Sequence, residues 1–131
     1  MQKSISLAII ITGLSIAGCC FDLTRVKYTP VVMKTTTPPK PMWTLTEKVD
    51  IPLESWSTTH LKSNTKWEYV GTIEQGDVYK TKDQTVTIKG SNMFEAYLVL
   101  SQEEIMGFYL PFEESFSRIS KPVKINRKIL N

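Results

Sequence analysis

The chain has 131 residues, of which 41% are hydrophobic and 22% are charged. This length suits one domain, and the composition is ordinary for a globular protein. The formal charge of +3 comes from 16 basic and 13 acidic side chains, and this balance argues against a nucleic-acid-binding protein, which would concentrate basic residues on one face. We therefore expect no nucleic acid among its partners.

The first residues have the pattern of a secretory signal peptide. Lys3 is followed by an apolar stretch from Ile5 to Ile16. A helix needs about 20 apolar residues to cross a bilayer, and this stretch has little more than half of them. A charged start, a short apolar middle and small residues at the end are typical of exported proteins. The pattern predicts a signal peptide over residues 1–18.

The residues before Cys19 decide which peptidase cuts the chain. The tetrapeptide Ile16-Ala17-Gly18-Cys19 has an aliphatic residue, two small residues and a cysteine, and it resembles the lipobox of bacterial lipoproteins. The resemblance is confined to the signal segment and its cysteine. It implies that a diacylglycerol is attached to the sulfur of Cys19 and that the signal peptidase cuts between Gly18 and Cys19. In such lipoproteins the new amino group is often acylated as well. Two or three acyl chains would anchor stably, because each buried methylene contributes about 0.8 kcal/mol.

Cys19 and Cys20 are the only cysteines, and other uses of the pair are disfavoured. A disulfide needs Cα atoms roughly 4.4–6.8 Å apart, and adjacent residues are closer. A metal site or Cys–His catalysis would depend on His60, the one histidine in the chain. We expect no metal and no cofactor. Cys20 is left to pair with a partner, to carry a further modification, or to lie near the lipid headgroups.

The resemblance also implies a location. In Gram-negative lipoproteins the residue after the lipidated cysteine influences sorting, and aspartate there favours the inner membrane. Here Cys20 takes that place, and Asp22 comes too late in the chain. We therefore expect the outer membrane, facing the periplasm, in a Gram-negative cell. In a Gram-positive cell the same anchor implies the outer side of the cytoplasmic membrane.

Residues 19–42 are predicted to form the lipidated N-terminus and a tether. Within them, the stretch 29–42 contains four prolines and four threonines but no acid and no glycine. Proline removes backbone donors and favours extended neighbours, which predicts a semi-extended spacer between membrane and domain. The alternative is that residues 21–32, where side-chain character alternates, add as a strand to the sheet edge of another protein.

From Trp43 onward, period-two alternation predicts a small β-rich domain over residues 43–131. The expected strands cover residues 66–73, 77–81, 84–89, 94–100 and 105–110, with a short last strand around 123–125. Tight turns between short strands predict an antiparallel meander, curled into a partly closed barrel or a sandwich that hides its edges. Residues 53–62 and 113–117 allow some helix, although neither stretch has an apolar stripe of helical period.

Few residues suggest catalysis. The sequence has no phosphate-binding loop and no CxxC, HExxH or GxSxG motif. The pairs Glu103/Glu104 and Glu113/Glu114 could supply the two carboxylates of a glycosidase, but adjacent acids between strands are typically solvated turn residues. His60 lies in a polar stretch, which favours the surface. We expect that the protein is not an enzyme.

The stretch GFYLPFEE at residues 107–114 is the least generic part of the domain. We expect half of it in the core and the exposed half to form a contact patch. The sequence as a whole predicts a lipid-anchored envelope protein with a binding or structural role and a protein partner, such as a component of a secretion or conjugation apparatus. The alternatives are a lipoprotein that excludes a phage or plasmid or inhibits a lytic enzyme, and a cell-wall-acting enzyme.

Overall fold

The computed structural model describes residues 26–53, 57–89 and 92–130. The regular secondary structure in these ranges consists of β-strands alone, and all paired strands are antiparallel. The predicted mainly β, antiparallel class is confirmed. The described parts of the two stretches that allowed helix contain strand and turn instead, in keeping with their lack of a helical apolar stripe.

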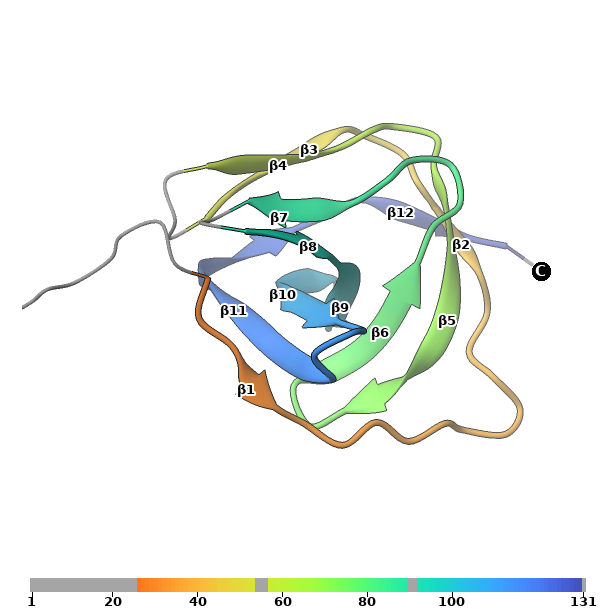
Figure 1. The fold of residues 1–131 in the computed structure, drawn as a ribbon. Coiled ribbons are helices and arrows are strands. Elements are labelled where there is room, and N and C mark those ends of the chain that lie inside the picture. Colours follow the sequence, from red (N-terminus) through yellow and green to blue (C-terminus); the bar gives the residue numbers. More distant parts are fainter. Residues whose placement is uncertain (1–25, 54–56, 90–91, 131) are drawn as a thin grey trace, which may run out of the picture.

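Twelve strands follow one another along the chain (Figure 1). They are β1 (Thr29–Pro30), β2 (Trp43–Leu45), β3 (Val49–Pro52), β4 (Thr58–Leu61), β5 (Lys66–Ile73), β6 (Gly76–Lys80), β7 (Thr87–Lys89), β8 (Met93–Glu95), β9 (Tyr97–Ser101), β10 (Glu104–Leu110), β11 (Ser115–Lys124) and β12 (Arg127–Ile129). Alternation predicted β5 with its observed bounds, and β6 and β10 to within one residue. The strand expected at 94–100 is divided, because Ala96 leaves the ladder and donates its N–H to the carbonyl of Val86 at 3.0 Å.

The main sheet has eight strands in the order β1-β11-β10-β9-β6-β5-β2-β12. Its centre is a meander, since β5–β6 and β9–β10–β11 pair in sequence and the β7–β8 hairpin is inserted between β6 and β9. The hairpins β3–β4 and β7–β8 form two separate two-stranded sheets. Figure 1 shows the main sheet curling around the interior, with the two hairpins on its remaining side.

The last two strands, β11 and β12, lie near opposite edges of the main sheet. Strand β11 pairs with β10, whereas β12 pairs with β2 at the far edge. The bend between them is held by backbone hydrogen bonds, from the N–H of Ile125 to the carbonyl of Glu103 at 3.1 Å and from the N–H of Thr46 to the carbonyl of Asn126 at 3.0 Å. This connection makes the curled sheet partly closed.

Both faces of the central strands are buried. The interior cluster is built around the side chains of Trp43, Trp67, Leu98, Phe108 and Leu110, together with residues of both hairpins. A second cluster covers the outer face of the same strands and consists of Ile73, Val78, Val99, Tyr109 and Phe116. Successive residues of a strand point to opposite faces, so β9 and β10 read as continuous apolar runs because they supply both clusters.

Residues 26–42, here called the N-terminal arm, complete the second cluster. Val31 and Met33 pack against it. Strand β1 of the arm pairs with β11, and Lys34 forms a bridge with Thr72 of β5. Thus the described part of the predicted tether, residues 26–42, lies along its own domain. Of the stretch considered for another protein's sheet, residues 29–30 pair with the edge of their own sheet.

Gly71 allows this close approach. A Cβ atom on Gly71 would lie 2.5 Å from both Cγ and Sδ of Met33 and 3.0 Å from the carbonyl oxygen of Lys34. The register of β5 against β6 also shifts between Tyr69 and Gly71. The bulge and the missing side chain together leave room for the arm.

Candidate functional site

The predicted lipidation site, Cys19, and the recognition residues Ile16, Ala17 and Gly18 lie outside the described residues. The described chain starts at Val26. In its three ranges there is no helix of sufficient length and apolar character to cross a membrane.

His60 is a surface residue, as the sequence predicted. Its ring nitrogen Nδ1 lies 2.7 Å from Oδ1 of Asp50 on the neighbouring strand, and both side chains are largely exposed. The hydrogen bond with His60 lowers the pKa of Asp50 below its ordinary value. An exposed pair of this kind contributes little to stability. Across the described ranges, no group of three or more His, Cys, Asp or Glu side chains is gathered in a way that could hold a metal ion.

The two acidic pairs lie at opposite ends of β10. Glu103 and Glu104 are at its beginning, and Glu113 and Glu114 are in the turn after it. A seven-residue strand is about 20 Å long, whereas the two carboxylates of a glycosidase are at most about 9.5 Å apart. The pairs therefore do not act together as a glycosidase centre.

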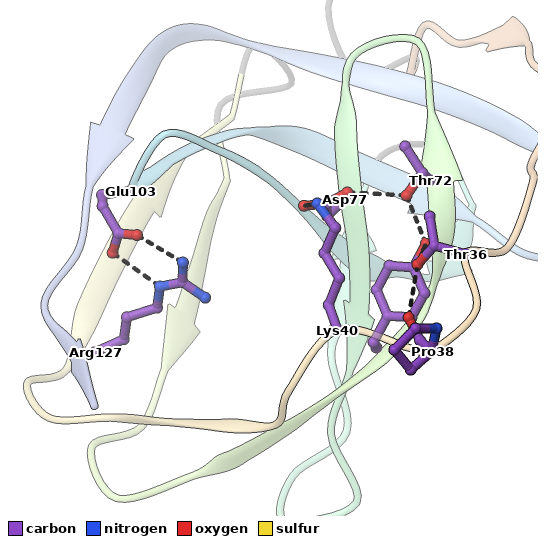
Figure 2. Close-up of polar contacts among 8 residues, drawn as sticks. Thr36, Pro38, Lys40, Thr72, Asp77, Glu103 and Arg127 are labelled. Carbon is purple, nitrogen blue, oxygen red and sulfur yellow. Dashed lines mark hydrogen bonds and ion pairs between the residues drawn. The ribbon is translucent and has the colours of Figure 1, made fainter. Parts of the chain in front are cut away.

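Glu103 instead forms a bidentate ion pair with Arg127. Arg127 donates from Nε to Oε1 of Glu103 at 2.8 Å and from Nη2 to Oε2 at 2.6 Å (Figure 2). The guanidinium carbon also lies 5.4 Å from the ring centroid of Trp43. The bidentate bond raises the pKa of Arg127 and lowers the pKa of Glu103. Because β12 bears Arg127 and the β9–β10 turn bears Glu103, this pair fastens the closure of the sheet.

Replacing Glu103 by Gln should change how stability depends on pH. The pKa of Glu103 is lowered from 4.5 by the hydrogen bond from Arg127, so the contact stabilises the folded state above that pH and is lost as the pH falls through the lower, folded value. We expect Glu103→Gln to cost about 1 kcal/mol at pH 7, a modest figure because the carboxylate is half exposed. The difference from the wild type should vanish in acid. Urea unfolding between pH 7 and pH 3 measures it.

The matched control for this prediction is Glu104→Gln. It removes the neighbouring carboxylate and leaves the contact between Glu103 and Arg127 in place. A pH profile that is the same for both variants would show that the bidentate pair does not stabilise the fold.

A polar network fastens the N-terminal arm to the β5–β6 hairpin (Figure 2). Lys40 of the arm donates to Oδ2 of Asp77 at 2.8 Å, and Thr72 donates to Oδ1 of the same carboxylate at 2.9 Å. The hydroxyl of Tyr69 lies 2.6 Å from that of Thr72 and 3.4 Å from that of Thr36 in the arm. Asp77 hence holds both the hairpin and the arm. Nothing local in the sequence indicated the contacts of Thr36 and Lys40, which join the arm to residues more than thirty positions away.

The stretch 107–114 divides as predicted between core and surface. Phe108, Tyr109 and Leu110 are buried, whereas Phe112 in the following turn is 82% exposed. Gly107 is required where β10 pairs with β11 beside a shift in register, since a Cβ atom there would lie 2.3 Å from the carbonyl oxygen of Ser117. Phe112 is therefore a large apolar side chain that the fold presents to solvent.

A cleft of about 440 Å³ lies between the arm, β11 and the β5–β6 turn, and we call it the arm cleft. Its lining residues are Lys27, Tyr28, Thr29, Gln75, Phe116 and Arg118. The hydroxyl of Ser117 donates to the carbonyl of Lys27 at 2.8 Å, and this bond holds the arm beside β11. Basic and aromatic side chains together suit an anionic ligand that also has an apolar part.

No protein-family model, curated protein or solved structure matches this chain.

Proposed function

We propose that this chain is a lipid-anchored cell-envelope protein that binds another protein of the envelope. The observation that carries the proposal is the tetrapeptide Ile16-Ala17-Gly18-Cys19 after an apolar segment, which resembles the lipobox. Membrane lipid is the first partner, through Cys19. The β domain acts by binding or by a structural role in an envelope assembly such as a secretion or conjugation apparatus. In a Gram-negative cell it faces the periplasm from the outer membrane.

Two features of the domain support a binding role. Phe112 lies in the turn after β10 and is 82% exposed, and aromatic side chains such as Phe are enriched in the buried cores of protein interfaces. The acidic side chains of Glu103 and Glu113 are separated by the length of β10, which does not favour carboxylate catalysis between them. Both features point to contact as the task of the domain.

The binding role is tested by photo-crosslinking in living cells from a photoreactive amino acid at position 112. We expect one defined envelope protein to be captured from this position, because an exposed aromatic anchor is buried at the centre of an interface. The matched control is the same amino acid at position 82, since Lys82 lies in an exposed turn between β6 and β7. Recovery of the uncrosslinked chain alone, or the same products from both positions, would contradict a binding role for this patch.

A further inference from the structure

The arm cleft has the charge of a site for anions. Lys27 and Arg118 line it, both are exposed, and none of the described residues that line it is acidic. Arginine binds phosphate oxygens through a planar fork, and lysine acts as a point charge beside them. A singly charged phosphodiester is therefore well matched to the two cations.

The other wall of the cleft is apolar. Phe116 belongs to the second hydrophobic cluster and is almost fully buried. Tyr28 also lines the cleft and is partly exposed. Its ring meets that of Phe94, which packs on the interior cluster, edge-on with centroids 5.8 Å apart. A tyrosine with one apolar and one hydrated end is typical of the boundary between membrane and water. The cleft thus offers cations for a phosphate and the ring of Phe116 for the carbon atoms attached to it.

The cleft is also within reach of the membrane. Lys27 follows Cys19 by eight residues, and a fully extended chain of that length spans at most about 28 Å. The described chain enters the domain at the arm, beside β11 (Figure 1). A lipid at Cys19 would hold the cleft close to a bilayer surface, where the effective concentration of headgroups is high.

From these three features we infer that the arm cleft binds the anionic headgroup of a phospholipid in the membrane that holds the anchor. The headgroup phosphate lies between Lys27 and Arg118, and its glycerol carbons lie against Phe116. Binding in this way sets the orientation of the domain on the membrane. The inference rests on the proposed function, because it requires the lipid at Cys19.

The test uses the full lipidated chain, reconstituted in vesicles of phosphatidylcholine or of phosphatidylcholine and phosphatidylglycerol in equal parts. The rate of acetylation of each lysine amine is measured by mass spectrometry. A basic residue at an anionic surface gains a factor of about five in binding, so we expect acetylation of Lys27 to slow about fivefold in the anionic vesicles. The rate at Lys82 should not change, since the loop between β6 and β7 is distant from β1 (Figure 1).

Two variants separate the cleft from general surface charge. Arg118→Gln removes one of the two cations, and we expect the protection of Lys27 to be largely lost. Lys124→Gln removes an exposed cation of the same strand that does not line the cleft, and the protection should persist. Equal protection of Lys27 in these two variants would overturn the inference.

Other outcomes also decide the matter. Equal acetylation of Lys27 in both kinds of vesicle would overturn the headgroup site while leaving the anchor intact, which the mass of the same sample shows. Equal protection by inorganic phosphate with phosphatidylcholine vesicles would identify a phosphate site in place of a headgroup site. If Lys27 is protected from acetylation in cells but in neither kind of vesicle, the ligand of the cleft is an acidic protein and the headgroup site is overturned. A chain without lipid at Cys19 would refute the proposed function, and this inference with it.

Discussion

Trp43→Ala should lower the free energy of unfolding by about 3–5 kcal/mol, the range for removing a large aromatic side chain from a core. Trp43 is fully buried. Its ring stacks on Trp67 with centroids 5.6 Å apart and meets Tyr79 edge-on at 5.3 Å. Its strand, β2, also joins β5 to β12. Small domains have only about 5–15 kcal/mol of stability, so this one loss removes a large share of it.

Urea unfolding followed by circular dichroism measures the effect, since fluorescence would change with the loss of a tryptophan. The matched control is Phe112→Ala, which truncates an aromatic side chain that is 82% exposed and should change stability by no more than about 0.5 kcal/mol. An unfolding midpoint of Trp43→Ala equal to that of Phe112→Ala would contradict the assigned core.

The two tryptophans should differ when each is replaced by Phe. The indole N–H of Trp67 donates to the hydroxyl of Thr65 at 2.9 Å, whereas the indole N–H of Trp43 has no hydrogen-bond partner among the described residues. A buried donor without a partner costs about 1–3 kcal/mol. Trp43→Phe removes such a donor and should therefore be tolerated better than Trp67→Phe, which keeps the comparison informative if Trp43→Ala fails to fold.

Cys19→Ser should abolish attachment of the lipid and cleavage of the signal peptide. The hydroxyl of serine does not accept the diacylglycerol, and by resemblance the peptidase of this pathway cuts only the lipidated precursor. We expect an intact, unlipidated chain that includes residues 1–18, detected by mass spectrometry. The wild type should show the mass of a chain that begins at Cys19 and bears two or three acyl chains, which anchor it stably.

Cys20→Ser is the matched control for this prediction. It removes a thiol one position away and leaves the residues Ile16 to Cys19 unchanged. We expect normal cleavage, lipidation and membrane fractionation for this variant. A Cys19→Ser chain that is cut and found in the membrane fraction would refute the lipobox interpretation.

Alternation of apolar and polar residues predicted strands in which one face is buried throughout. Val86 and Ile88 are both buried, as their spacing indicated, but the strand expected at 84–89 begins only at Thr87. Strand β11 was missed over most of its length, because Ser115 and Ser117 are buried polar residues and interrupt the apolar alternation. Their hydroxyls donate to the carbonyls of Glu113 and Lys27. Those hydrogen bonds make their burial tolerable, but they depend on the folded chain and leave no pattern in the sequence.

The placement of the N-terminal arm was also beyond local reasoning. Prolines correctly favoured an extended chain, but extension alone does not say whether a segment projects into solvent or lies on a sheet. The arm lies on the sheet because Gly71 leaves room for Met33 and because Asp77 binds Lys40. Each contact joins residues more than thirty positions apart.

The sequence by itself determined the mainly antiparallel β class and the expectation of a lipid anchor at Cys19, because a strand's alternation and a peptidase's recognition residues are both local. Only the tertiary structure decided that Arg127 meets Glu103 and that Lys27 and Arg118 line one cleft. The physical reason is register. Which side chains meet across a curled sheet depends on how every strand pairs with its neighbour, and no short stretch of sequence contains that information.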